Sequence, residues 1–429
     1  MTVRTKRRRG LALAATAVAG AMLLAACGGS GGDSGSGAAS GGNDRGPITY
    51  VQGKDNSNVA APIVAKWNAA HPTEKVTLKE QTDAADQQHD DDVQHFQAKD
   101  PSYDVISVDV VWTAEFAAKG WLQTLTGKYA LPTDGFLEPP VKAATYNGKL
   151  FAAPFASDGG MLYYRSDLVK TPPKTLDEMW QDCSIAKAKN MDCYAGQFQK
   201  YEGLTCNATE AINTFGGEVV GKDGVTATVD SAKSKAGLQM LVDHYKNGDI
   251  PKQAITYQEE QGRQSFEAGK LLFLRNWPYV YNLASTDASS KIKGKFAVAP
   301  LPGVSGPGAS TLGGHSLGMS VYSKHKATAL DFMKFWTSPE IQKFLVVKAS
   351  NAPILTALYD DPELIKQLPY LTTLKTAIEN AIPRPVSPFY PAVTKAIEDN
   401  SYAAIKGDKS VDQALKDMQG AITAASAGS

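Results

Sequence analysis

Histidine and cysteine are scarce in this chain of 429 residues, which has six His and four Cys. No Cys-x-x-Cys pair or neighbouring His accompanies the cysteines, so a structural zinc site is not expected. His89 and His95 flank an acidic run, but six residues turn a helix by about 240°, which places the two rings on different faces. We interpret this segment as a solvated acidic face and predict no metal site.

Two common signatures of catalysis are also missing. The chain has no Gly-x-x-x-x-Gly-Lys-Ser/Thr motif, which excludes a P-loop ATPase, and no Gly-x-Ser-x-Gly nucleophile motif. No catalytic residue and no cofactor is therefore predicted.

An excess of positive charge is absent as well. Lys+Arg and Asp+Glu each total 44, and five of the basic residues lie among the first nine. Residues 27–429 thus carry 39 basic and 44 acidic residues, a net charge of −5. A mildly acidic body is a poor electrostatic match for nucleic acid, so no nucleic-acid partner is expected. The composition, 43% hydrophobic and 21% charged, is typical of a globular protein of two or three domains.

Long apolar runs are limited to the N-terminus. Residues 4–9 are basic and residues 11–26 are apolar, which predicts a secretory signal peptide over residues 1–26. The run is shorter than the ~20 residues of a comfortable membrane span. Leu24–Cys27 resembles a bacterial lipobox, so we expect lipid attachment at Cys27; the alternative is an ordinary signal peptide with an incidental cysteine.

The residues that follow predict a tether. Residues 27–46 are rich in Gly and Ser, a composition that behaves as a flexible linker. We therefore expect an exported protein, anchored by lipid to the outer face of the cytoplasmic membrane. In that compartment one pair among Cys183, Cys193 and Cys206 can form a disulfide. Cys183–Cys193 closes the shortest loop, although the sequence does not determine the pairing.

The body of the chain alternates between strand and helix patterns. Strand patterns occupy residues 48–52, 76–79, 104–109, 150–157, 161–165 and 296–301. Helical patterns occupy residues 59–67, 84–98, 238–245, 329–336 and 411–422, with another helix starting at Ser338-Pro339. This alternation predicts an α/β protein with a parallel sheet.

Several stretches carry a resemblance to a known family. They are residues 104–112, 151–168 (FAAPFASDGGMLYYRSDL), 172–175, 266–281 (FEAGKLLFLRNWPYVY), 313–314, 384–390 and 411–419. In this order they resemble bacterial extracellular solute-binding proteins of sugar-importing ABC transporters, the maltose-binding-protein-like class. The RNWPY and RPxxPxY stretches resemble binders of trehalose, maltose and other α-glucosides.

The resemblance implies two α/β lobes joined by hinge strands, with the ligand cleft between them. Lobe 1 would comprise residues 47–157 and 304–354, and lobe 2 residues 158–303 and 355–429. The implied function is a monomeric, lipid-anchored receptor that captures an α-glucoside disaccharide and delivers it to the ABC permease in the membrane. Two alternatives stay open: a secreted glycoside hydrolase, and a binding protein of the same fold for another oligosaccharide or a polyol.

A sugar site needs carboxylates that accept hydroxyl hydrogens, a cationic donor and an aromatic surface. Asp109 ends a predicted strand, where ligands of α/β proteins bind, although it could instead cap a helix. Asp158 precedes two glycines at the first predicted lobe crossing, where a turn is the alternative. The resemblance favours Glu259 over its neighbour Glu260 as a ligand contact.

Aromatic and basic candidates complete the predicted site. Pro278 forces an extended backbone at Trp277, and the resemblance places this indole in the cleft as a stacking surface, with Trp112 as the next candidate. Arg384, between two prolines, is a forked donor to hydroxyls. Further candidates are Gly314 for close backbone approach, His315 where relatives often carry an aromatic, and the wall residues Tyr201, Glu202, Phe389 and Tyr390.

Overall fold

The computed structural model of the chain describes residues 44–221 and 223–428. The predicted signal peptide (1–26), the predicted lipidation at Cys27 and the tether as far as residue 43 lie outside the described residues. Among the described residues, no helix combines the length and apolar character needed to span a membrane.

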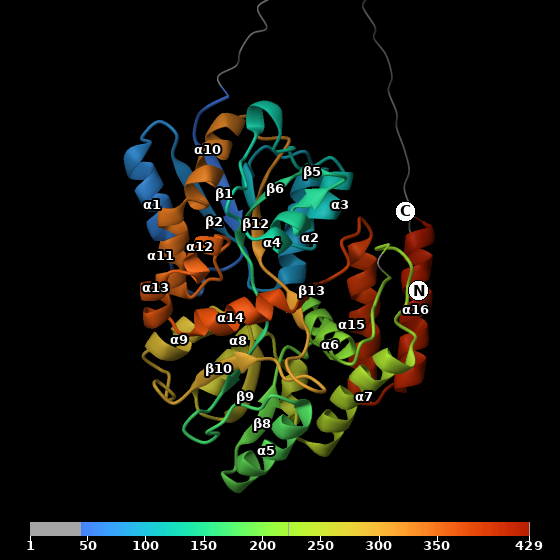
Figure 1. Cartoon of the computed structure of the whole chain (residues 1–429). Coiled ribbons are helices and arrows are strands. Elements are labelled where there is room, and N and C mark those ends of the chain that lie inside the picture. Colours follow the sequence, from blue (N-terminus) through green and yellow to red (C-terminus); the bar gives the residue numbers. More distant parts are fainter. Residues whose placement is uncertain (1–43, 222, 429) are drawn as a thin grey trace, which may run out of the picture. The chain divides into compact units, whose positions relative to one another are not determined.

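The elements of the described chain alternate as predicted for an α/β protein (Figure 1). The strands are β1 (Ile48–Gln52), β2 (Val76–Glu80), β3 (Val105–Asp109), β4 (Thr145–Tyr146), β5 (Lys149–Leu150), β6 (Ala152–Ala156), β7 (Met161–Tyr164), β8 (Asp192–Ala195), β9 (Leu271–Asn276), β10 (Ala297–Pro300), β11 (Ser310–Leu312), β12 (His315–Met319) and β13 (Ala381–Pro383). The helices are α1 (Ala60–Ala70), α2 (Ala85–Gln97), α3 (Thr113–Ala118), α4 (Glu138–Ala143), α5 (Leu176–Ala188), α6 (Glu202–Thr214), α7 (Ala232–Asn247), α8 (Glu259–Glu267), α9 (Val280–Thr286), α10 (Lys326–Trp336), α11 (Pro339–Ala349), α12 (Thr356–Tyr359), α13 (Pro362–Gln367), α14 (Tyr370–Glu379), α15 (Tyr390–Lys406) and α16 (Val411–Ala427).

The first large sheet has the strand order β2-β1-β3-β12-β6. β1 pairs in parallel with β2 and β3, whereas β12 is antiparallel to β3 and β6. Successive side chains of β1 face opposite layers, as strand geometry requires. Tyr50 packs against Phe332 and Trp336 of α10, and Val51 joins the other cluster, which contains Phe96 of α2. Helices therefore cover both faces of this sheet.

The second large sheet has the order β10-β7-β9-β8 and lies below the first in Figure 1. One face packs against α14, because Tyr163 shares a cluster with Leu371 and Leu374. The other face packs against α5 through Leu162 and Met179. The two sheets with their covering helices form two α/β lobes, as the predicted fold class requires.

The chain passes between the two sheets at more than one place. It leaves β6 of the first sheet and enters β7 of the second over residues 157–160. It returns from β10 through β11 to β12 over residues 301–314. β11 pairs in parallel with the late strand β13, so the connecting region is itself held by a two-stranded sheet.

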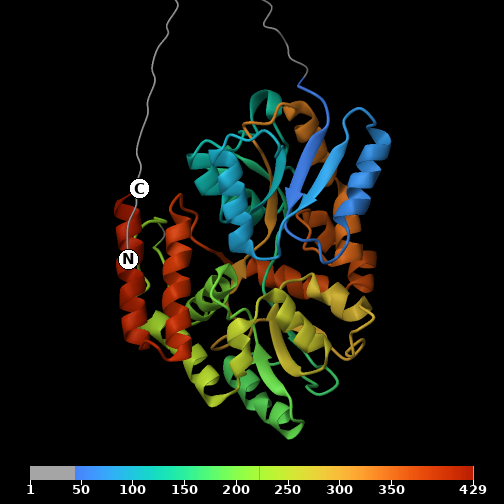
Figure 2. The ribbon, with the colours of Figure 1, turned by 180° about the vertical axis from the view of Figure 1, so that it is seen from behind.

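The last two helices pack on the second lobe. α15 and α16 lie against each other and beside α6 and α7, and Figure 2 shows this pair, in red, from behind. The predicted stripe of the last helix is buried at Val411, Leu415, Met418 and Ile422. The 3.6-residue periodicity thus identified a core face correctly.

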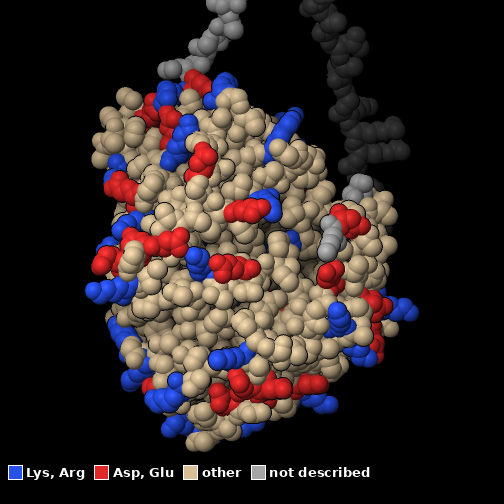
Figure 3. All heavy atoms as spheres, viewed as in Figure 1, with Lys and Arg blue, Asp and Glu red and all other residues tan. Residues whose placement is uncertain are grey.

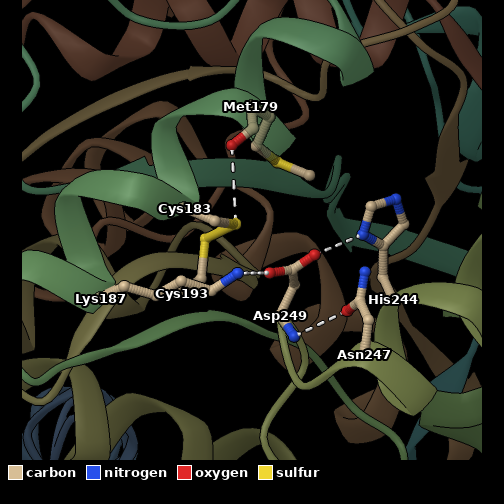
Figure 4. The surroundings of a disulfide bond; sticks show 7 residues. All are labelled: Met179, Cys183, Lys187, Cys193, His244, Asn247 and Asp249. Carbon is tan, nitrogen blue, oxygen red and sulfur yellow. Dashed lines mark hydrogen bonds and ion pairs between the residues drawn. A yellow bond between two sulfur atoms is a disulfide. The ribbon is translucent and has the colours of Figure 1, made fainter.

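A disulfide joins α5 to β8 in the second lobe. It links Cys183 to Cys193, and Cys206 is a free, buried cysteine (Figure 4). Beside it, the carboxylate of Asp249 forms an ion pair of 3.1 Å with Lys187 and accepts a hydrogen bond of 2.9 Å from the imidazole of His244. These contacts tie α5 to the end of α7. On the face seen in Figure 3, acidic and basic side chains are interspersed.

Candidate ligand cleft

A cavity of about 310 Å³ is lined by residues of both lobes, a size within the range of small-molecule sites. Nine residues predicted from the sequence line it: Asp109, Asp158, Tyr201, Glu202, Glu259, Trp277, Gly314, His315 and Arg384. Three others are outside the lining. Trp112 is buried beside Phe116, Phe389 packs against the same core cluster, and Tyr390 is buried at the start of α15.

Arg384 joins the two lobes at the floor of the cleft. Its Nη2 donates to Oδ1 of Asp109 over 3.0 Å, and its Nη1 donates to Oε1 of Glu202. Asp109 ends β3 of the first sheet, whereas Glu202 begins α6 of the second lobe. The guanidinium is 3% exposed, and its Nε has no hydrogen-bond partner among the described residues. This Nε is itself buried, so one donor of the group is left unpaired inside the protein.

The carboxylate of Glu202 is held in place by hydrogen bonds from α15. It accepts hydrogen bonds from the hydroxyl of Tyr390 and, over 2.6 Å, from Oγ1 of Thr394. Burial raises the pKa of Glu202, and the neighbouring charge of Arg384 opposes this rise. Tyr390 therefore acts on the cleft through Glu202.

Asp109 does not cap α3, the alternative considered for it, because the N-cap of that helix is Trp112 without a side-chain hydrogen bond. Its Oδ1 accepts a hydrogen bond of 3.2 Å from the backbone of Val111, in the turn before α3. The same carboxylate lines the cleft and contacts Arg384, so this turn contact leaves it at the cleft.

A second pair of polar groups lies at the start of α8. The hydroxyl of Tyr201 donates to Oε2 of Glu259 over 2.7 Å, and burial raises the pKa of this carboxyl while the Tyr201 bond lowers it. Both Glu259 and Glu260 line the cleft. The carboxylate of Glu260 is paired with Arg263 and accepts a hydrogen bond from Tyr279. Glu259 is thus the member of the pair without a cationic partner at hydrogen-bond distance among the described residues.

Trp277 directly follows β9 and lines the cleft, half-buried. The guanidinium carbon of Arg275 lies 3.9 Å from the centroid of the indole, a cation–π contact. A Cβ added to Gly313 would come within 2.9 Å of the indole, so the chain at this glycine closely approaches the ring. The indole of Trp277 is therefore packed against the guanidinium of Arg275 and the backbone at Gly313.

Gly314 is required by the backbone, independently of the close approach to a ligand that the sequence predicts. Its φ is +116°, and a Cβ there would lie 2.2 Å from the carbonyl oxygen of Ala156. The next residue, His315, pairs with Asp109 in the sheet register, and burial lowers its pKa. The glycine thus admits a tight backbone crossing that brings the imidazole beside the Asp109 carboxylate.

Asp158 lies at the first connection between the sheets. Its backbone exchanges hydrogen bonds of 3.1 and 2.9 Å with Gly313. Burial, reinforced by the charge of Asp109, raises the pKa of Asp158 to about 7. The cleft therefore contains a carboxyl that takes up a proton near neutral pH.

Sequence reasoning missed the loop after β1, residues 53–57, all of which line the cleft. Asp55 fixes this loop by accepting hydrogen bonds from the backbone of Val59 (2.6 Å) and Ala60 (2.7 Å) at the start of α1. Lys54 and Asn56 beside it are further candidate contacts. The signal that could have found them is the rule that identified Asp109, since this loop also follows the carboxyl end of a parallel strand.

No group of three or more His, Cys, Asp or Glu that could hold a metal ion occurs within residues 44–221 and 223–428. The cleft lining contains hydrogen-bonding groups and an aromatic side chain.

Comparisons with known proteins agree with this geometry. The family model described as bacterial extracellular solute-binding protein matches residues 63–373. A probable ABC transporter-binding protein of Deinococcus radiodurans is 33% identical over 344 residues, 77% of this chain and 81% of the relative. A maltotriose-binding protein of Pyrococcus abyssi is 27% identical over 331 residues, 72% of this chain and 69% of that protein.

Solved structures show the same relationship. The maltose-bound MalE3 of T. maritima has a TM-score of 0.83 and 34% identity, over 88% of this chain and 98% of that one. The GacH receptor of Streptomyces glaucescens, solved without ligand and with acarbose, has a TM-score of 0.79 at 22% identity, over 89% of this chain and 98% of its own. These likenesses confirm the predicted fold class.

Proposed function

The chain belongs to the family of bacterial extracellular solute-binding proteins, and we propose that it is the receptor of an ABC importer for an α-glucoside disaccharide such as maltose or trehalose. The observation that carries the proposal is the composition of the cleft. It combines carboxylates, one forked cationic donor and an indole, contributed by both lobes. These groups match the hydroxyls and flat apolar faces of a sugar.

The names of the similar proteins support the choice of an α-glucoside. One is a maltotriose-binding protein, and another was solved with maltose bound at 34% identity to this chain. A cavity of about 310 Å³ also favours a small saccharide over a long oligosaccharide.

Capture followed by closure is the proposed mechanism. A ligand shifts a two-lobed protein toward its closed state only if it binds that state more tightly. Asp109 and His315 come from the first sheet, and Trp277 and Glu259 from the second lobe. A sugar that contacts both sets gains its full binding energy only when the lobes are close together. The closed complex then docks on the permease.

The remaining features of the proposal concern topology and location. We propose lobes of residues 47–157 with 304–354 and of residues 158–303 with 355–429, supported by the strand order of the two large sheets. The family implies an exported protein. We further propose that lipid on Cys27 anchors a monomer to the outer face of the cytoplasmic membrane.

Calorimetric titration of residues 28–429 tests this function. The titrants are maltose, trehalose, sucrose and the polyol ribitol, with product analysis of the same samples. Saturable heat at one site with the glucoside left intact is the expected result. Cleaved sugar would make the protein a hydrolase, and heat with ribitol alone would give it a different cargo.

A further inference from the structure

The side chain of Arg275 is fully buried at the end of β9 and is paired on both sides of its fork. Its Nε and Nη2 donate to the two carboxylate oxygens of Glu210 over 2.8 and 2.5 Å. Its Nη1 donates to Oε1 of Gln197 over 3.0 Å. A planar guanidinium held in this way has one orientation, because three of its donors are fixed by two acceptor groups.

The plane of this guanidinium supports the indole of Trp277. The 3.9 Å contact places the cation over one face of the ring. Because Arg275 is completely buried whereas Trp277 lines the cleft, the covered face is the inner one. Under the proposed function, the part of the ring away from Arg275 is the part available to a ligand. An electrostatic contact of this kind is strongest where water is excluded.

The same ion pair also contacts the connections between the two sheets. Oε1 of Glu210 accepts a hydrogen bond of 3.0 Å from the backbone of Thr311 in β11. A Cβ on Gly160 would lie 2.6 Å from that oxygen and 2.7 Å from Nη2 of Arg275. The Arg275–Glu210 pair is thus packed against both connections between the sheets, residues 157–160 and residues 301–314. It leaves no room for a side chain at position 160.

We propose that Arg275 is a positioning residue, which through its pair with Glu210 fixes the indole of Trp277 relative to the strands that connect the lobes. This inference rests on the proposed function, in which Trp277 is the surface for the sugar. It differs from a purely structural role, since a buried ion pair can stabilise a fold without affecting the orientation of a particular ring.

The test compares Arg275→Lys with wild type in the mature chain, residues 27–429. Lysine keeps the charge but has no planar fork to pair with Glu210 and to cover the ring. The first readout needs no ligand: the indole N–H resonance of Trp277, assigned by its disappearance in Trp277→Phe. The second is the affinity for maltose, measured in the wild-type background and in a Trp277→Ala background.

A matched control is Arg165→Lys. Arg165 follows β7 in the same sheet and also forms a forked pair, with Asp167, at 2.7 and 2.6 Å. It does not line the cleft. If Arg275→Lys does not fold, Gln197→Met removes the Nη1 acceptor, together with the bonds of Gln197 to Asn207 and to the Arg275 carbonyl, but leaves the pair with Glu210. It should displace the same resonance by a smaller amount.

We expect Arg275→Lys to shift the Trp277 resonance and to weaken maltose binding about tenfold, as the loss of a desolvated cation–π contact would. In the Trp277→Ala background the same change should cost less than about twofold, because residues that act through one another are not additive. An unmoved resonance, or equal losses in both backgrounds, overturns the inference. If wild type binds none of the tested sugars, the proposed function fails, while the resonance still decides the positioning role.

Discussion

Trp277 is the large aromatic side chain that the second lobe presents to the cleft next to Gly313. Replacing it with alanine removes the apolar surface on which a sugar ring would stack. We expect Trp277→Ala to weaken glucoside binding by about 2 kcal/mol or more, roughly 30-fold, as truncating a central aromatic anchor does. Isothermal calorimetry measures the loss. Trp180→Ala is the control, since Trp180 is equally half-buried in the same lobe but stacks on His244 away from the cleft.

The carboxyl of Asp158 should make stability depend on pH. Its pKa is raised to about 7 in the folded protein by burial and by Asp109, whereas an unfolded aspartate titrates near 3.8. Between these values the folded state binds more protons than the unfolded state, so the contribution of this group to stability falls as pH rises from about 4 to about 7. Asp158→Asn removes that contribution.

Urea unfolding at pH 4.5 and pH 7.5 checks this prediction. The variant should lose less stability than wild type between the two values. The exposed Asp134→Asn change provides the comparison, and it should leave the wild-type slope unaltered. If the stability of the variant changed with pH as much as that of wild type, the carboxyl of Asp158 would be deprotonated in the folded protein at both pH values.

The sequence identified single residues of the site better than it identified their partners. Asp109 was accessible because a local rule places it at the end of a parallel strand, whereas Trp277 was assigned to the cleft by the family resemblance. The contact between Arg384 and Glu202 joins residues 182 positions apart in the chain. No local sequence pattern predicts this contact, because it depends on how α15 and α6 pack together.

At the scale of elements, the segment before α15 links the two lobes by charge. Arg384 is buried between Asp109 of β3 and Glu202 of α6. Arg384→Met leaves two carboxylates without their shared cation, and breaking a buried pair in this way costs about 3–5 kcal/mol. We therefore expect a lower urea midpoint together with weaker glucoside binding. Arg384→Lys retains the charge, so its stability and its affinity for the glucoside should decrease less. An Arg384→Met variant as stable as wild type would contradict this role.

Uniform burial did not decide which strands were predicted, because β3, β6 and β7 are fully buried and were predicted, whereas the equally buried β9 was not. The pattern at residues 104–109 predicted β3 correctly. β9, whose residues are all buried, was not predicted as a strand. A short apolar run such as Leu271–Leu274 does not differ between a buried strand and a buried helix, because no exposed position reveals its period. The resemblance drew attention to this stretch but did not predict its conformation.

At the scale of the whole molecule, the proposed mechanism predicts a change of shape. The cleft has walls from both lobes, and the sugar gains contacts when they approach. The radius of gyration from small-angle X-ray scattering should therefore decrease when saturating maltose is added to residues 27–429. Trp277→Ala should compact only at higher sugar concentrations. An unchanged radius at saturation would mean that binding occurs without closure.

The position of β12 in the first sheet has a consequence for biogenesis. This strand lies between β3 and β6, yet it follows them in the chain by more than 150 residues. Until residue 319 is available for pairing, a folding chain therefore exposes two unpaired strand edges, and such edges invite wrong pairing. Closing so long a loop also slows folding. The first lobe thus cannot be completed until β12 has reached its two neighbours. The intermediate without β12 is therefore the stage at which the polypeptide depends most on protection from aggregation.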